Sequence, residues 1–383
     1  MTSIIGKNVN QKEGFEAFIP NPFPPKGIFD VSSNLLLEIG KADRLIGNLN
    51  GSTNNLPDVD FFLKMFVMKD AEASSQIEGT QASLIDALQV GSSRMSLEDS
   101  ETDAWDIIYY IKALNYGIEH LEKIPLSLRF IRSVHKTLMT GARSSHFADP
   151  GHFRKTQNWI GGTTPSNASF VPPPVDAMKK SLNDFEKFLH NNKDVLPLIH
   201  IGIMHAQFET IHPFLDGNGR TGRLLITFLL LQQKLLERPV LFLSSYFKRH
   251  QQVYYQRLNE YRYDGGVEKW LEFFLDGVIE IAQESIQVSR KISKLRDDDM
   301  AKIQSLAKRE SESGVLVLSR LFSSPIVTNQ MIMEWTGFSR PGAQGVINRL
   351  IEIDILKSQE DKWNQDKSYI YKRYTDIFIG DEG

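Results

Sequence analysis

The stretch from His212 to Arg223, HPFLDGNGRTGR, brings together residue types that can act jointly on a phosphate group. Pro213 lacks an N–H donor and disfavours helical backbone before it, so the apolar helical run should end at His212 and leave its imidazole free. Gly217-Asn218-Gly219 then permits a sharp turn whose N–H groups lead into a second helix. A glycine-rich turn at a helix N-terminus is an anion site.

The charged side chains of this stretch extend the same chemistry. Arg220 and Arg223 lie on neighbouring faces of one helical turn, where two guanidiniums can hold more than one phosphate. Asp216 offers a hard oxygen ligand for Mg²⁺ shared with those phosphates. His212, whose ordinary pKa is near neutral, is the candidate general base for an attacking hydroxyl. Together these groups predict transfer of a phosphorus-containing group from a nucleotide.

Each of these features also has a structural interpretation when it is taken alone. A Gly-x-Gly turn after a helix is common, and neighbouring arginines are usually a solvated face. His200 and His205 suggest a zinc site, but their spacing places them roughly 140° apart around a helix, and no HExxH pattern is present. We therefore assign these two histidines to packing or to the surface.

The complete string is similar to the HxFx(D/E)GNGRxxR signature of Fic-domain proteins. That resemblance implies transfer of AMP from Mg²⁺-bound ATP to a Ser, Thr or Tyr hydroxyl of a protein, with release of pyrophosphate. It implies that His212 is the base, that Asp216 is the metal ligand and that Phe214 is a buried anchor. The ATP-binding residues it implies are Gly217, Asn218, Gly219, Arg220, Thr221, Gly222 and Arg223.

Two further matches refine this resemblance. A kinase-like branch of the family carries Lys at the place of Gly219, so Gly219 favours AMP transfer over phosphate transfer. Upstream, SSQIEGT resembles the family's (S/T)xxxE(G/N) inhibitory pattern, with Ser74, Glu78 and Gly79. A Glu78 carboxylate paired with Arg223 would occupy the guanidinium meant for the γ-phosphate, and a misplaced phosphate reacts slowly. A surface glutamate is the alternative interpretation.

Other segments resemble further parts of the same family. Residues 150–162 and 168–174 look like the flap that docks the target segment, which places Ile160, Gly161, Phe170 and Val171 at the docking edge. Tyr254 and Tyr255 are candidates for the adenine pocket, although adjacent tyrosines on a helix are as often packing residues. From the residues alone, the Gly-Gly and triple-proline segment 158–174 predicts a small hairpin or an ordinary surface loop.

The elements that must position these residues are mainly helices. Apolar residues recur with helical spacing over 196–211 and 220–236, and two more helices are expected at about 32–48 and 57–77. Long helices with short loops predict an all-α bundle bearing a small β-hairpin flap, while the aromatic and proline-rich stretch 15–31 predicts an extended arm over a core. We expect an N-terminal region with the inhibitory helix (1–100), a catalytic core (101–290) and a helical linker with a winged helix-turn-helix (291–383).

The C-terminal segment has a different character. A helix, a turn at Gly337 and a second helix capped by Ser339 are followed by two alternating stretches, which predicts a helix-turn-helix with a wing. Residues 339–373 carry seven basic and five acidic residues, a weaker excess than a dedicated DNA reader shows. DNA binding is therefore open but not favoured over protein contacts, even with Arg340 and Arg349 on the second helix.

Composition limits the remaining classes. The 383 residues contain no cysteine, which excludes disulfides, thiolate metal sites and a cysteine nucleophile. No stretch reads as a signal peptide or a membrane span, so we expect a cytoplasmic protein without a membrane partner. Family analogy suggests a homodimer. The functions left open are an autoinhibited AMP transferase, an enzyme that removes AMP with the help of Glu78, and a DNA-binding regulator that senses nucleotide.

Overall fold

The computed structural model describes residues 4–54, 56–82, 103–141, 148–191, 194–263, 266–359 and 367–379. The chain divides into two compact units. Unit 1 comprises residues 1–47 and 67–282, and unit 2 comprises residues 48–66 and 283–383. The C-terminal unit therefore begins near the predicted boundary at 291 but also takes in residues 48–66, which the sequence analysis had placed with the N-terminal region.

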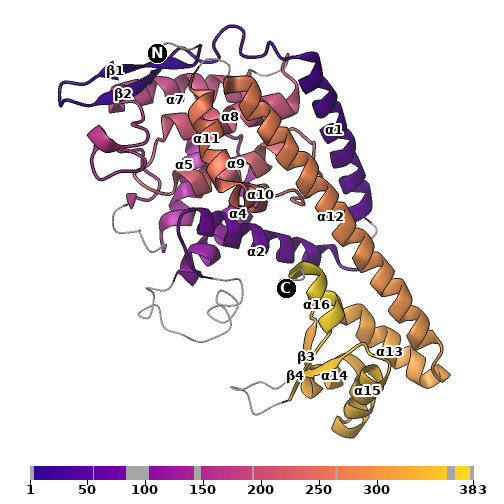
Figure 1. Cartoon of the computed structure of the whole chain (residues 1–383). Helices are drawn as coiled ribbons and strands as arrows, with labels where there is room; N and C mark the ends of the chain where they lie inside the picture. Colours follow the sequence, from indigo (N-terminus) through magenta and orange to yellow (C-terminus); the bar gives the residue numbers. More distant parts are fainter. Residues whose placement is uncertain are drawn as a thin grey trace. The chain divides into compact units, whose positions relative to one another are not determined.

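Helices dominate the described residues, as the sequence predicts. Elements with residues in unit 1 are β1 (Gly6–Asn10), β2 (Glu16–Pro20), α1 (Ser33–Thr53), α2 (Val59–Ile77), α4 (Ala104–Leu121), α5 (Leu128–Met139), a short 3₁₀ helix (Pro165–Asn167), α7 (Val175–His190), α8 (Pro197–Ile211), α9 (Asn218–Gln232), α10 (Ser244–Arg249), α11 (Gln251–Tyr261) and α12 (Gly266–Gln304). Figure 1 shows α8 and α9 inside the helical body of this unit, with α4, α5 and α11 around them.

The centre of unit 1 is the helix pair α8 and α9. Every residue of α8 from Leu198 to Ile211 is buried, and so is most of α9. A helix that is apolar all round must have neighbours on every side, and it cannot show the one-sided stripe of a surface helix. Gly117 of α4 allows one close approach, because a Cβ there would lie 2.1 Å from the ring of Phe228 on α9. The functional turn at 212–217 therefore joins two fixed helices.

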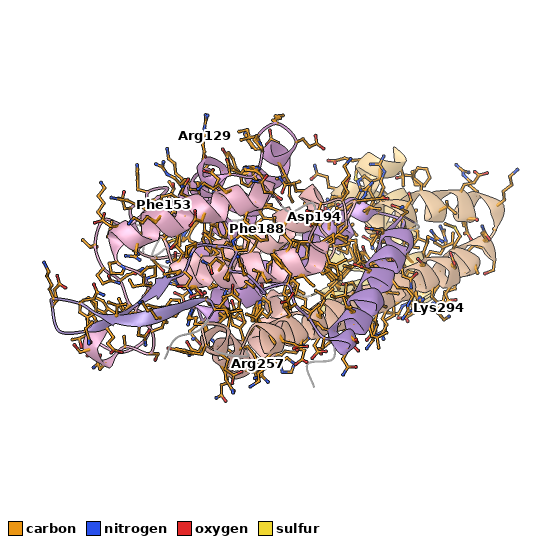
Figure 2. The ribbon with its side chains drawn as sticks, turned by 90° about the horizontal axis from the view of Figure 1, so that it is seen from above. Arg129, Phe153, Phe188, Asp194, Arg257 and Lys294 are labelled. Carbon is orange, nitrogen blue, oxygen red and sulfur yellow. The ribbon has the colours of Figure 1, made fainter. Side chains whose placement is uncertain are left out.

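The N-terminal segment combines the predicted arm with an unpredicted hairpin. Strands β1 and β2 pair in antiparallel register, with Asn8 opposite Phe18. After the hairpin the chain lies over α7, where the ring of Phe29 stacks on Phe188 at 5.6 Å and Phe23 meets the same ring edge-on at 5.2 Å. Figure 2 labels Phe188 among the helices of this unit. The arm over a core is therefore confirmed for the residues after the hairpin.

Unit 2 contains the C-terminal elements. These are α13 (Lys308–Leu321), β3 (Ile326–Thr328), α14 (Asn329–Thr336), α15 (Arg340–Glu352), β4 (Lys357–Gln359), β5 (Ser368–Ile370) and α16 (Lys372–Ile379). Gly337, in the left-handed region at φ 71°, ends α14, and Ser339 precedes α15, as the sequence predicts. The strands form an antiparallel sheet in the order β3-β5-β4, of which β3 was not predicted. The helix-turn-helix is thus present, while its assignment as a winged helix stays a prediction.

Residues 48–66 belong to unit 2 through an aromatic cluster. The ring of Phe61 lies 5.3 Å from that of Tyr374, and the ring of Phe62 lies 4.4 Å from that of Phe66. The ring of Phe378 packs against Phe61, Phe62 and Phe66. Helix α16 supplies Tyr374 and Phe378 to this cluster, although its first residues were expected to belong to the second alternating stretch of the wing. None of the described helices combines the length and the apolar character needed to cross a membrane.

Candidate active site

His212 stands where helix α8 ends, as its following proline predicts. Its backbone adopts the left-handed conformation, with φ 49° and ψ 62°, and its N–H still bonds the carbonyl of Phe208. A non-glycine residue rarely takes this conformation, and such strain persists only where the surrounding structure imposes it. The His212 side chain remains 17% exposed at the wall of a cavity.

The turn after His212 is closed by a single side chain. The Asn218 amide accepts a hydrogen bond from the N–H of Phe214 at 2.8 Å and donates one to the carbonyl of Phe214 at 2.9 Å. Gly217 precedes α9 with φ 74°, in the left-handed region that favours glycine. The turn thus leaves the first N–H groups of α9 at the cavity, at the place where the sequence predicts an anion site.

A buried histidine from α5 supports this turn from behind. The imidazole of His135 stacks on the ring of Phe214 at 3.6 Å, with the planes within 3°. Its Nδ1 accepts from the Gly151 N–H at 2.9 Å, so Nε2 carries the proton and donates to the carbonyl of Asp216, also at 2.9 Å. Burial lowers the pKa of His135 to about 4, so the imidazole is neutral at physiological pH. Phe214 is completely buried, as expected of an anchor.

Arg223 is joined to the segment that resembles the inhibitory pattern. Its Nε donates to the Ser74 hydroxyl at 2.8 Å, and its Nη2 donates to the Ser74 carbonyl at 2.9 Å and to Glu78 Oε1 at 2.7 Å. The Arg223 side chain is 2% exposed and that of Glu78 is 35% exposed. Burial opposes the charge of Arg223, but the Glu78 carboxylate outweighs it and raises the pKa of Arg223. Gly79, with φ 93°, follows the last turn of α2.

Asp216 and its neighbours fit a magnesium site only in part. The Asp216 carboxylate is 45% exposed, accepts from the Gly217 N–H through Oδ1, and lies 3.7 Å from Arg220. Among the described residues no group of three or more His, Asp or Glu side chains gathers as a metal site. A single carboxylate is nonetheless the pattern by which Mg²⁺ is held when substrate phosphates supply the other ligands.

The remaining predicted ATP-binding residues of α9 face away from the cavity. The Arg220 side chain is 4% exposed and its Nη1 lies 3.3 Å from Asp106 of α4. The Thr221 hydroxyl donates to the carbonyl of Gly217, and the carbonyl of Gly222 bonds His205 Nδ1. This geometry favours a supporting role for these three residues, because their side chains or carbonyls are used within the protein.

One cavity of about 590 Å³ collects most of the predicted site. Its volume is typical of pockets that enclose a small-molecule ligand. Its walls are formed by Glu78, Trp159, Ile160, Gly161, Ser169, Phe170, Glu209, His212, Leu215, Asp216, Gly217, Asn218, Gly219, Arg223, Tyr254, Tyr255, Leu258, Asn259 and Arg262.

The two candidate adenine-pocket tyrosines both line this cavity. Tyr254 is buried, stacks on Phe247 at 4.5 Å and shares a hydrogen bond of 2.9 Å with His205 Nε2. Tyr255 is 42% exposed and donates to the carbonyl of Ile77 at 3.3 Å. His200 and His205 are both fully buried and hydrogen-bonded, which agrees with the packing role assigned to them. Aromatic faces at one end and N–H groups at the other suit a nucleotide.

The predicted flap forms a bridge between Ile160 and Phe170. The N–H of each donates to the carbonyl of the other, at 2.8 and 3.2 Å, and Gly161 turns the chain with φ 67°. The carbonyl of Val171 accepts from the N–H of Phe18 in β2 at 3.0 Å, so this part of the flap already has a strand beside it. The flap is therefore present as a short hairpin.

Several residues of the site had not been identified from the sequence. Buried Arg154 donates to the carbonyls of His212, Thr156 and Pro173, and so ties the turn at His212 to the base of the flap. The Arg262 guanidinium lies 3.4 Å from the centre of the Phe170 ring. Glu209 is 5% exposed, and its Oε2 lies 3.7 Å from His212 Nδ1. Its position one helical turn before His212 is the signal that sequence reasoning could have used.

The charges around His212 set its protonation. Burial, followed by the cations Arg262 and Arg154, lowers the pKa of His212 to about 3, although the main-chain carbonyl of Glu209 and the charge of Asp216 partly offset them. Burial raises the pKa of the Glu209 carboxyl to about 7, while Arg223 lowers it and Glu78 raises it. His212 is consequently neutral at pH 7, as a base must be before it accepts a proton.

Comparisons with known proteins match the parts of the chain that carry His212 and Glu78. The Fic/DOC family matches residues 125–230, and the N-terminal region of the Fic/DOC family matches residues 36–119. Relatives named Protein adenylyltransferase Fic are 29% identical over 163 residues in Drosophila grimshawi and 28% identical over 209 residues in Aedes aegypti. These matches cover 41% and 52% of this chain, but only 31% and 38% of the relatives' own lengths.

Solved structures show the same fold. A Fic family protein from Desulfovibrio desulfuricans has a TM-score of 0.55 at 20% identity, covering 91% of this chain and 97% of its own. A Fic domain containing signaling protein from Bacteroides thetaiotaomicron has a TM-score of 0.52 at 19% identity, covering 66% and 97%. With the signature turn and the helix pair that carries it both present, the chain carries a Fic/DOC domain over residues 125–230, preceded by a Fic/DOC N-terminal region over residues 36–119.

Proposed function

We propose that this protein is an adenylyltransferase that transfers AMP from Mg²⁺-bound ATP to a hydroxyl side chain of a target protein, and that Glu78 restrains it. The observation that carries the proposal is the common cavity that joins His212, the anion turn before α9 and the tyrosine pair. The relatives that carry the name Protein adenylyltransferase Fic support the same activity.

The proposed reaction assigns one task to each part of the cavity. The N–H groups at the start of α9 and the Arg223 guanidinium hold the phosphates, and Tyr254 and Tyr255 contact the adenine. His212 takes the proton of the target hydroxyl as its oxygen bonds the α-phosphorus, and the bond to the β-phosphate breaks with release of pyrophosphate. Mg²⁺, held by Asp216 and the phosphates, would neutralise their charge.

In this proposal, the flap docks the target segment, and the pair of Glu78 with Arg223 restrains the transfer of AMP. An extended target segment can add its backbone beside the flap at Ile160 and Gly161, which would bring its hydroxyl to the cavity wall that His212 lines. Glu78 holds Arg223 at 2.7 Å, so ATP that binds beside this pair would lack the guanidinium needed by its γ-phosphate.

Labelled ATP tests the proposal directly. Wild type, Glu78→Gly and Glu78→Gly/His212→Ala are incubated with Mg²⁺ and ATP labelled at the α- or the γ-phosphate, with and without host extract. We expect Glu78→Gly to leave α label on protein, and His212→Ala to abolish it. Retention of γ label would show phosphate transfer instead, and no label from either position would favour the nucleotide-sensing alternative.

A further inference from the structure

Glu209 is a buried carboxyl whose position demands an explanation. It is 5% exposed, and its Oε1 has no hydrogen-bond partner among the described residues. An unpaired polar atom in a protein interior is destabilising, so groups that remain in such positions are often retained for function. Gly222 provides the space, because a Cβ on that residue would lie 2.3 Å from Glu209 Oε1.

The nearest titratable partner of this carboxyl is the candidate base. Glu209 Oε2 lies 3.7 Å from His212 Nδ1, and that nitrogen is itself buried with no side-chain hydrogen-bond partner in the described chain. The His212 side chain keeps 17% exposure on the cavity, so the opposite edge of the ring, with Nε2, is left to face the substrate. One carboxylate oxygen of Glu209, Oε2, therefore faces the buried ring nitrogen of His212, while the other, Oε1, lies towards Gly222.

The charges near His212 make a carboxylate at this place useful. Arg262 and Arg154 disfavour a positive charge on the imidazole, although proton transfer from the target hydroxyl must create one. A carboxylate beside the opposite ring nitrogen stabilises the imidazolium, as it does in other histidine-based mechanisms. Asp216, the other carboxylate whose charge favours protonated His212, is assigned to the metal in the proposed reaction.

Building on the proposed function, we infer that Glu209 is a positioning residue whose carboxylate orients the His212 imidazole and stabilises the imidazolium formed when His212 accepts the target proton. The target hydroxyl gives its proton to His212 Nε2, its oxygen bonds the α-phosphorus and pyrophosphate leaves. The ionised form of Glu209 is the form that acts: it keeps its charge during the step, and its carboxylate moves from contact with a neutral ring to contact with a cation.

The contact between Glu78 and Arg223 also influences the ionisation of Glu209. Glu78 raises the pKa of Glu209 and Arg223 lowers it. Removing Glu78 takes away a negative charge and leaves Arg223 without its carboxylate, so Glu209 ionises at lower pH in the released enzyme. The charged and titratable groups around Glu209 are Glu78 directly after α2, His205 on α8, His212 directly after α8, Arg223 on α9, Tyr254 on α11 and Arg262 directly after α11.

The experiment uses Glu209→Gln, which preserves size and removes the charge, in the Glu78→Gly protein. We expect kcat for AMP incorporation to fall on the order of 10²-fold, with the KM for Mg²⁺-bound ATP unchanged, because a positioned acid–base group typically contributes this much. The rise in rate with pH that accompanies ionisation of Glu209 should also disappear. A purely structural role would alter neither the pH profile nor kcat at constant KM.

A matched control and a second readout keep the inference separate from the proposed function. Gln207→Met changes another buried polar residue of α8 outside the cavity and should leave kcat and the pH profile unchanged. At pH 7, the ¹⁵N resonance of His212 Nδ1 should move in Glu209→Gln but not in Gln207→Met, whether or not AMP is transferred. An unmoved resonance, or an unchanged kcat in an active Glu78→Gly background, would overturn the role of Glu209, whereas an inactive Glu78→Gly parent would count against AMP transfer itself.

Discussion

Replacing Glu78 by Gly should release the activity by an amount that the structure allows us to work out. Arg223 makes three hydrogen bonds to the Ser74–Glu78 segment, of which only the contact of 2.7 Å with Glu78 Oε1 involves a carboxylate. A hydrogen bond between charged groups contributes about 1.5–3 kcal/mol, and each ~1.4 kcal/mol is a factor of ten. If Arg223 must leave Glu78 to bind the γ-phosphate, the rate should rise about 10- to 100-fold, with the lower end favoured because Glu78 is 35% exposed.

The assay compares initial rates of α-label incorporation in wild type, Glu78→Gly and Glu78→Gln at one concentration of Mg²⁺-bound ATP. Glu78→Gln keeps an acceptor for Arg223 without the charge, so its rate should fall between the other two. Glu72→Ala, a carboxylate change on the helix that precedes Glu78 and outside the cavity, is the matched control and should leave the rate unchanged. Equal rates in wild type and Glu78→Gly would refute the inhibitory role of this pair.

A stability measurement on the same variants checks the physical cause. Glu78→Gly leaves Arg223, which is 2% exposed, without its carboxylate, so the free energy of unfolding should fall. Mg²⁺-bound ATP should then raise the melting temperature of Glu78→Gly more than that of wild type, because only the variant offers an unpaired guanidinium to the γ-phosphate. An identical increase in both proteins would mean that Arg223 is equally available to ATP in each.

Three further predictions follow from particular contacts. Asp216→Asn in the Glu78→Gly protein should weaken the dependence of AMP incorporation on Mg²⁺ and lower its rate, measured by Mg²⁺ titration after chelation; an unchanged titration would contradict the metal role. Burial lowers the pKa of His200 to about 4, so its contribution to stability is complete above pH 6.5 and is lost as the pH falls toward 4. Between pH 7 and 5 this loss is about 2 kcal/mol, and His200→Gln should remove it from denaturant unfolding curves. Finally, the ratio of the rate of Glu78→Gly to that of wild type should fall as the ATP concentration rises; a constant ratio would mean that ATP does not compete with Glu78 for Arg223.

The sequence was sufficient to predict the parts of the site that are contiguous in it. His212 ends its helix because Pro213 follows, and Gly217 turns the chain because a left-handed residue is needed there. The helix-turn-helix in unit 2 was predictable for the same reason, since Gly337 and Ser339 are local signals. Local backbone chemistry determines these features, so one sequence contains all the information that they require.

Features that depend on distant contacts were missed or only partly predicted. His135 is separated from Asp216 by 81 residues and bonds its main-chain carbonyl, which no side-chain pattern can reveal. Asn218 was assigned to phosphate through its motif, but both ends of its amide hold the backbone of Phe214. Strand β3 of three residues depends on its pairing with β5, which lies far along the chain. The β1–β2 hairpin was missed although its two strands are close in sequence. The pairing of Glu78 with Arg223, 145 residues apart, could be anticipated only through a family resemblance.

The contacts of α2 favour a local release of inhibition over movement of its C-terminal half. Asp70, which is 2% exposed, accepts hydrogen bonds from the N–H of Ser244 and the hydroxyl of Tyr110, and the carbonyl of Ile77 accepts from Gln251 and Tyr255. Moving this part of the helix would break all four bonds and leave a buried carboxyl unpaired, which is strongly destabilising. Rotation of the Glu78 side chain breaks only its bond to Arg223 and brings an already part-exposed carboxylate into water. The γ-phosphate would replace that carboxylate on the guanidinium, so nucleotide and inhibitor compete for one buried cation while the helix stays in place.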